Sequence, residues 1–123
     1  MFDRLFGGTS KVKSVNPREA WELLSTHGVS GGNAAPVLID VRESWEYAGG
    51  HAKGAKNIPL SQLGKRMGEV PRDRPVLVIC QSGRRSINAA HHMLQQGITE
   101  VTNVSGGTTV WSMHGLPLEG KRR

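Results

Sequence analysis

The chain has very little cysteine: one residue, Cys80, among 123. A single cysteine cannot close a disulfide within the chain, which argues against a small secreted scaffold and fits a reducing cytosol. The thiol is therefore either inert packing or a reactive group. By base rate, a lone cysteine at the end of an apolar segment is more often a buried small hydrophobe. Its neighbours in the sequence have to decide between the two.

Long apolar runs are also lacking. No stretch approaches the roughly 18 to 20 apolar residues of a membrane span, and the N-terminal MFDRLFGG is too short and too charged for a signal peptide. The sequence thus predicts a soluble, cytoplasmic protein with no membrane partner. Its length suits one domain with one core. We expect a loosely ordered lead-in over residues 1–12, a single domain over 13–119 and a basic tail over 120–123.

Acidic residues are the minority charge: 10 Asp and Glu against 16 Lys and Arg leave a net charge of +6 at pH 7. This balance favours anionic partners. The excess is diffuse, and part of it lies in KVK and the final KRR, which we interpret as solvated ends. With no basic helix or set of stacking aromatics, a small anionic ligand is favoured over nucleic acid. His51 has no Cys or His nearby at ligand spacing, so we expect no metal and no cofactor.

Two runs, VLIDV (37–41) and VLVIC (76–80), are apolar almost without interruption, and each follows a proline. Such runs suit strands covered on both faces, as in a parallel sheet. EVTNV (100–104) and KNIP (56–59) are weaker strand candidates. Alternation of these strands with helices predicts an α/β fold with right-handed crossovers. The segments with helical signals are ESWEYAGG, SQLGKRM, RRSINAAHHMLQQG and GTTVWSMHG.

One further helix has clear boundaries. Asn16 is a good N-cap, Pro17 suits the first helical position, and Glu19 stands where a capping box requires an acid. The sequence therefore predicts a helix over 17–26, ended by Gly28.

Packing residues can also be assigned. On the helix expected after Cys80, one stripe of side chains is expected to face the core, with Gly97 as the stop. The stripe comprises Ile87, Ala90, His91 and Leu94. We interpret the three tryptophans, Trp21, Trp45 and Trp111, as core or lid packing rather than as a binding box.

Cys80 stands at the end of a predicted strand, where ligand sites gather in open parallel sheets. The following QSGRR turns into a helix whose first N–H groups have no intrahelical partner. Gly83 allows the loop a positive φ and a nest of amides. With Arg84 and Arg85, these amides are expected to hold the pKa of Cys80 below its usual value of about 8.5. Of the two arginines, we expect Arg85 to face the site and Arg84 the solvent.

Three separated motifs carry a family resemblance: LIDVRESWEYAGGHAKGAKNIPL, CQSGRRS and NVSGGTTVWSMHGLPLEG. In this order they resemble a single-domain rhodanese of the sulfurtransferase family, over about Val15 to Glu119. The resemblance implies a central five-stranded parallel sheet with helices on both faces. It also implies that Asp40 and Arg42 support the active loop, as an ion pair between surface and loop rather than as catalytic groups. The loop implied comprises Cys80, Gln81, Ser82, Gly83, Arg84 and Arg85.

The activity implied by the resemblance is sulfur transfer by a ping-pong mechanism. Cys80 takes sulfane sulfur from a small anionic donor such as thiosulfate, holds it as a persulfide, and passes it to cyanide in vitro or to a thiol in the cell. Gln81 and Ser82 stand where rhodaneses specialised for thiosulfate have a basic pair, so the donor stays open. A protein acceptor is compatible with this scheme, and we expect a monomer.

Two alternatives remain open. One is a persulfide carrier or partner-binding module with little turnover, although inactive homologues commonly lack the thiol. The other is a cysteine phosphatase or arsenate reductase, whose loop reads Cys, five residues, Arg. Here that arginine position holds Ser86, and the arginine comes one place earlier, at Arg85. The shorter loop favours a single sulfur atom on Cys80 over a tetrahedral phosphate.

Overall fold

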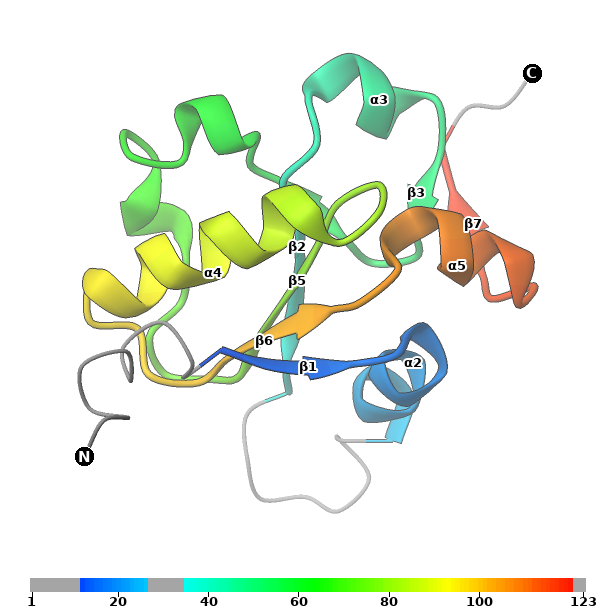
Figure 1. Cartoon of the computed structure of the whole chain (residues 1–123), viewed down its shortest axis with the longest axis horizontal. Coiled ribbons are helices and arrows are strands. Elements are labelled where there is room, and N and C mark those ends of the chain that lie inside the picture. Colours follow the sequence, from blue (N-terminus) through cyan, green and yellow to red (C-terminus); the bar gives the residue numbers. More distant parts are fainter. Residues whose placement is uncertain (1–11, 27–34, 121–123) are drawn as a thin grey trace.

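A computed structural model of the chain describes residues 12–26 and 35–120 (Figure 1). Nearly all of the predicted lead-in and tail, and the predicted helix stop at Gly28, lie outside these ranges.

A five-stranded parallel sheet forms the centre of the molecule, as the resemblance implied (Figure 1). The strand order is β1-β6-β5-β2-β4, and every pairing is parallel. The two apolar runs of the sequence form the adjacent strands β2 and β5, so their carboxyl ends lie at the same edge of the sheet. The strands are β1 (Lys13–Val15), β2 (Val37–Asp40), β4 (Lys56–Asn57), β5 (Val76–Ile79) and β6 (Val101–Val104).

Helices cover both faces of this sheet (Figure 1), and none in the described residues is long and apolar enough to cross a membrane. SQLGKRM forms only short 3-10 turns rather than an α-helix. The remaining elements are α2 (Pro17–Thr26), α3 (Ser44–Ala48), η3 (Leu60–Gln62), η4 (Met67–Glu69), α4 (Arg84–Gln95), α5 (Gly107–Met113) and an antiparallel pair, β3 (His51–Ala52) with β7 (Leu118–Glu119).

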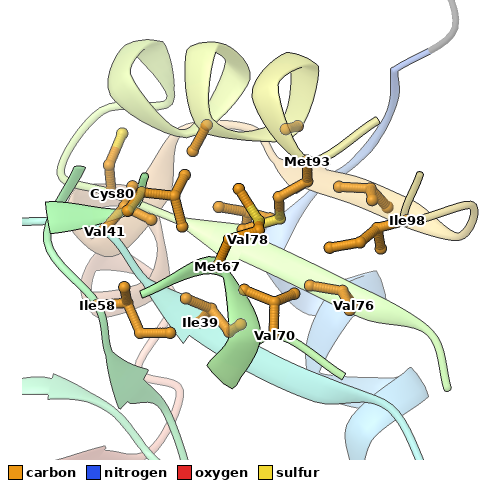
Figure 2. Close-up of a cluster of buried hydrophobic side chains, with 14 residues drawn as sticks. Ile39, Val41, Ile58, Met67, Val70, Val76, Val78, Cys80, Met93 and Ile98 are labelled. Carbon is orange, nitrogen blue, oxygen red and sulfur yellow. The ribbon is translucent and has the colours of Figure 1, made fainter. Parts of the chain in front are cut away.

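Side chains of the central strands alternate between two apolar layers, because successive residues of a strand point to opposite faces. Val76, Val78 and Cys80 belong to the layer beneath α4. Leu77 and Ile79 belong to the layer beneath α2 and α5. Figure 2 shows the first layer, with the sulfur of Cys80 at one end of it, pointing toward α4. The alternation of side chains along β5 therefore places the thiol of Cys80 on the face of the sheet that α4 covers.

The predicted helix over 17–26 is confirmed, and so is its capping box. The N–H of Glu19 donates to Asn16 Oδ1 over 2.8 Å, and the N–H of Asn16 donates to Glu19 Oε1 over 3.0 Å. Two donors that a helix leaves unpaired at its start are satisfied in this way.

The predicted stripe of α4 is right for Ala90, which is buried, and for Leu94, which is half-buried and packs against the core. It is wrong for Ile87. Ile87 is 38% exposed, whereas the residues of α4 buried against the sheet are Ser86, Ala89, Ala90 and Met93. The physical reason is size: small side chains on this stripe let the helix approach the sheet closely, and the larger Ile87 lies outside the contact.

Three strands were not predicted, namely β1, β3 and β7. β1 contains Lys13, which the sequence interpretation placed among solvated ends, and its residues are exposed or half-buried at the sheet edge. β3 and β7 are two residues each, and they pair His51 with Glu119. Segments this short carry no usable periodicity.

Of the three tryptophans, Trp111 is the one fully buried. Its Nε1–H donates to the Pro117 carbonyl over 2.7 Å, and its ring meets that of the half-buried Trp21 edge-on at 6.0 Å between centroids. Trp45 is 75% exposed, so it is not a core residue.

We expect Trp111→Ala to lower the free energy of unfolding by about 3–5 kcal/mol, because it empties a closed core position and removes a hydrogen bond. Equilibrium urea denaturation measures the change. Trp45→Ala is the matched control and should alter stability by less than about 0.5 kcal/mol. Equal effects of the two substitutions would contradict this assignment of the core.

Candidate active site

Cys80 follows β5 directly and is 0% exposed. The N–H of Gly83 donates to Cys80 Sγ over 3.1 Å, so the loop folds back over its own first residue. Gly83 is the N-cap of α4 and has φ +103°, the left-handed conformation that its identity predicted. A Cβ on Gly83 would also lie 3.1 Å from the backbone nitrogen of Gly106. The loop therefore needs glycine at this position for both conformation and space.

The pKa of Cys80 is set by two opposed effects. Burial raises the pKa, because it removes water from the charged form. Hydrogen bonds with the side chain of Ser86 and with the backbone amides of Ser86, Gly83 and Ser82 lower it and outweigh burial, so the pKa lies below its ordinary value. The direction agrees with the sequence prediction. The cause is a hydroxyl and amides rather than mainly the two arginines.

Ser86 and Asn103 are site residues that the sequence interpretation missed. Ser86 Oγ lies 3.3 Å from Cys80 Sγ and donates to Asn103 Oδ1 over 2.5 Å. Both side chains are buried, and Nδ2 of Asn103 donates to Ser14 Oγ over 3.3 Å. The available signal was the asparagine itself, since this residue type is depleted in strands and needs polar partners when buried.

Arg85 and Arg84 lie in different surroundings. The guanidinium of Arg85 pairs with Glu46 of α3 through two contacts, Nη1 to Oε1 at 2.8 Å and Nη2 to Oε2 at 3.0 Å. The hydrogen bond with Glu46 is the largest influence that raises the pKa of Arg85, and the charge of Cys80 adds to it, so this guanidinium lies within electrostatic reach of the sulfur. Arg84 is exposed. Arg85 is thus already paired with a carboxylate, and which arginine faces a donor stays a prediction.

Glu46 was not anticipated as part of this site. Its hydrogen bond with Arg85 is the largest of the influences that hold its pKa at about 2, against the opposing effect of burial. The carboxylate therefore stays charged throughout the physiological pH range. It faces an arginine 39 residues away in the sequence, a separation that no local pattern reveals.

Asp40 and Arg42 form an ion pair of 2.8 Å, as predicted, but not at the surface. Asp40 is 0% exposed and Arg42 is 3% exposed. Both lie at the end of β2, which is an inner strand of the sheet between β5 and β4. Arg42 also donates from Nη1 to Gln81 Oε1 over 3.1 Å and from Nη2 to the Gly50 carbonyl over 2.8 Å. The pair joins the end of β2 to the loop after Cys80, which is the geometry of a support.

The opposite side of the loop is held by α5. The N–H and the hydroxyl of Thr108 both donate to the Cys80 carbonyl, over 2.8 and 3.0 Å, and the N–H of Thr109 donates to the Gln81 carbonyl over 3.1 Å. Gly107 has φ +60°, and a Cβ there would lie 2.5 Å from both carbonyl oxygens. The glycine pair of NVSGG thus lets α5 touch the loop backbone.

An open groove of about 730 Å³ lies beside the loop, between α3 and α5. Gln81 of the loop contributes to its lining, together with Glu46 and the exposed side chains of Trp45 and Met113. A second cavity, of about 490 Å³, lies against α2 and β2 and includes no loop residue, so it is not the candidate site.

His51 behaves as the sequence interpretation expected of a histidine bonded to backbone, since its Nδ1 lies 3.0 Å from the Tyr47 carbonyl oxygen. Within residues 12–26 and 35–120, no group of three or more His, Cys, Asp or Glu side chains is placed to hold a metal ion.

With a cysteine at a strand end, a loop that folds over it and a glycine pair behind that loop in place, the chain can be compared with known proteins. The profile of the rhodanese-like domain matches residues 16–114. The chain belongs to the rhodanese-like domain family. The rhodanese resemblance of its three motifs is therefore confirmed.

Individual relatives agree with this membership. The Bacillus subtilis (strain 168) protein YqhL, which is named as uncharacterized, is 50% identical over 74 residues, covering 60% of this chain and 59% of YqhL. The chain thus spans less than two thirds of that relative. The thiosulfate sulfurtransferase GlpE of Actinobacillus pleuropneumoniae serotype 3 (strain JL03) is 34% identical over 105 residues, covering 85% of this chain and 91% of GlpE.

Among solved structures, a rhodanese-related protein from Thermoplasma volcanium superposes with a TM-score of 0.74 at 29% identity. The match covers 89% of this chain and 99% of that protein. The fold prediction is confirmed, and relatives named as sulfurtransferases support that general class of enzyme.

We expect Gly107→Ala to destabilise the protein by about 1–3 kcal/mol more than a left-handed alanine alone costs, because the added carbon overlaps the loop carbonyls. Gly115→Ala is the matched control: Gly115 has a similar φ of +69° and open space around it. That variant should lose about 1–2 kcal/mol from conformation only. Chemical denaturation compares the two, and equal losses would show that the close approach of α5 is unimportant.

Proposed function

We propose that this protein is a sulfurtransferase in which Cys80 accepts sulfane sulfur as a persulfide and passes it to a thiophilic acceptor. The observation that carries the proposal is the pair of polar groups against one buried sulfur: the N–H of Gly83, which donates to Sγ over 3.1 Å, and the hydroxyl of Ser86, which lies 3.3 Å from it. Together with the lowered pKa of Cys80, they favour the thiolate, which is the nucleophilic form. The relative named thiosulfate sulfurtransferase supports the same donor class.

Two half-reactions follow from a thiolate in this setting. Cys80 attacks the outer sulfur of a donor such as thiosulfate, a Cys80–sulfur bond forms, and the donor S–S bond breaks with its electron pair leaving on sulfite. Cyanide in vitro, or a thiol in the cell, then attacks the terminal sulfur of the persulfide. The Cys80–sulfur bond breaks, Cys80 is released as a thiolate, and thiocyanate or a new persulfide leaves. The loop amides stabilise the anion present at each stage.

Two of the three guanidiniums at the loop are paired within the protein, Arg42 with Asp40 and Arg85 with Glu46, and the third, Arg84, is exposed. If Arg84 faces solvent, an anionic donor relies on the amides or competes with a carboxylate for Arg85. We propose a small anionic donor that binds weakly and a thiol acceptor, which can be a protein thiol. A cytoplasmic location and a monomer complete the proposal.

The same pairing disfavours dephosphorylation. A cysteine phosphatase needs an arginine that lies over the phosphate, whereas Arg85 comes one place early in the loop and turns to Glu46. Turnover of a phenyl phosphate that Cys80→Ser abolishes would favour the phosphatase instead.

The central test is the mass of the intact protein after incubation with thiosulfate. We expect one added sulfur, about 32 Da, that cyanide or dithiothreitol removes. Cys80→Ala should take up none and should keep its fold, as circular dichroism can check. A wild-type protein that takes up no sulfur from thiosulfate or from an organic persulfide would refute the proposal.

Glu46→Gln should strengthen the binding of thiosulfate, because it removes the carboxylate charge that is paired with Arg85. Glutamine keeps an oxygen for the N–H of Glu43, which Glu46 accepts over 2.9 Å. The Arg85–Glu46 pair is part-buried. Ion pairs near the surface are worth up to about 1 kcal/mol, so we expect the KM for thiosulfate to fall about two- to fivefold, and the gain to shrink in high salt. Steady-state kinetics with cyanide as acceptor measure it.

Arg85→Ala should raise the same KM, while Arg84→Ala, the exposed neighbour, serves as its control. In an Arg85→Ala background, Glu46→Gln should have no effect. Equal losses in the two alanine variants would show that Arg85 does not face the donor.

A further inference from the structure

Four polar side chains stand in series between the buried sulfur and the edge of the sheet. Cys80 Sγ lies 3.3 Å from Ser86 Oγ, which lies 2.5 Å from Asn103 Oδ1. Asn103 Nδ2 lies 3.3 Å from Ser14 Oγ on the edge strand β1. Cys80 and Ser86 are 0% exposed and Asn103 is 1% exposed, whereas Ser14 is exposed. A continuous hydrogen-bonded path therefore leads from the thiol across β6 to solvent.

The direction of the hydrogen bonds in this path matters, because a hydroxyl carries one proton. With its proton on Asn103 Oδ1, Ser86 offers only lone pairs to Cys80. That arrangement suits a thiol, whose S–H can donate to Ser86. A thiolate has no proton and needs Ser86 to donate instead. The hydroxyl of Ser86 cannot serve Asn103 and the thiolate at once.

Asparagine can resolve this conflict, because its side chain has a donor at one end and an acceptor at the other. When the amide turns over, Nδ2 donates to Ser86 Oγ and Oδ1 accepts from Ser14. The proton of Ser86 is then free to point at Cys80 Sγ. Every polar atom of the path keeps a partner in both arrangements, which is what buried polar groups require.

We propose that Asn103 is a positioning residue for the nucleophile: the orientation of its amide decides whether Ser86 accepts from the Cys80 thiol or donates to the Cys80 thiolate. Asn103 acts through Ser86 and does not itself touch the sulfur or the substrate. Its effect on sulfur transfer rests on the proposed function, whereas its effect on ionisation of the thiol does not.

Charged groups also surround Cys80. Arg85 of α4 with its partner Glu46 of α3, and the Asp40–Arg42 pair at the end of β2, face this region of the molecule. The substitutions that follow leave all four in place. A difference in ionisation between variants therefore does not arise from the loss of one of these four charges.

The test follows ionisation of Cys80 by the ultraviolet absorbance of its thiolate across a pH titration, with Cys80→Ala as the blank. Cys80 is the only thiol, so the signal belongs to one group. In Asn103→Asp the carboxylate can only accept, so it holds the proton of Ser86 away from the sulfur. We expect the midpoint to rise by about one pH unit, which lowers the thiolate fraction and the rate of sulfur transfer about tenfold at any pH below the wild-type midpoint.

Asn103→Leu separates this mechanism from loss of packing, because it removes the acceptor that competes for the proton of Ser86. Its midpoint should stay at or below that of the wild type, even if its stability falls. Midpoints that rise equally in Asn103→Asp and Asn103→Leu would overturn the proposal.

Ser86→Ala separates the mechanism from simple charge repulsion. It should raise the midpoint by itself, and adding Asn103→Asp to it should change little further, while Ser86→Thr should restore the wild-type value. A full additional shift in the Ser86→Ala background would mean that the carboxylate acts directly on the sulfur, which also overturns the proposal.

Ser14→Ala extends the test to a site where folding is not at risk. It removes the donor that the turned amide needs, so a smaller rise of the midpoint is expected. Ser105→Ala is its control, since Ser105 is also exposed and bonds β1 through the Val15 carbonyl, outside the path. Equal midpoints in the two serine variants would confine the mechanism to Ser86 and contradict the path to Ser14.

The positioning role of Asn103 and the proposed sulfurtransferase activity can fail separately. If the midpoints shift as expected in a protein that takes up no sulfur, the role of Asn103 stands and only the sulfurtransferase assignment is refuted.

Discussion

The whole site depends on the contact between α5 and the carbonyl groups of the active loop. Thr108 donates twice to the Cys80 carbonyl, and Gly107 makes room for the approach. This contact holds the carbonyl of Cys80, while the N–H of Gly83, at the start of α4, holds its sulfur. Since the first loop residues are held from both sides, the amides are oriented before any substrate arrives. Preorganised donors of this kind lose little free energy when charge develops on the atom they face.

Electrostatics at this site come from dipoles more than from free charges. The chain carries a net charge of +6, yet the arginines beside Cys80 are paired with Glu46 and Asp40. Their role is then largely architectural, because each pair ties the loop to another element. A site built in this way favours the anionic state of one sulfur atom without creating a strong general attraction for anions. This arrangement also explains why the diffuse positive charge of the sequence says little about the substrate.

Sequence patterns predicted those parts of the molecule whose conformation is determined by residues close together in the chain. The continuous apolar runs gave β2 and β5, the capping residues gave α2, and Gly83 gave the turn over Cys80. What the sequence could not reveal depends on residues that meet only in the fold. Glu46 bonds to Arg85, and Asn103 bonds to Ser86, although the partners lie far apart in the sequence. In the same way, β3 pairs with β7, which lies near the end of the chain. Ile87 was misplaced because the pattern of apolar residues ignores how closely a helix of small side chains can pack.

Cys80 belongs to the same apolar layer as Val76, Val78 and Met93, and so the sulfur that we propose to react is also a core atom. An extra sulfur on Cys80 would enter a layer packed at nearly crystalline density. Unloaded and loaded forms of the protein would thus be two differently packed molecules, with different resistance to unfolding. Loading of Cys80 with sulfur and the free energy of unfolding would be thermodynamically linked. The stability of the protein would then depend on the fraction of molecules that hold the extra sulfur.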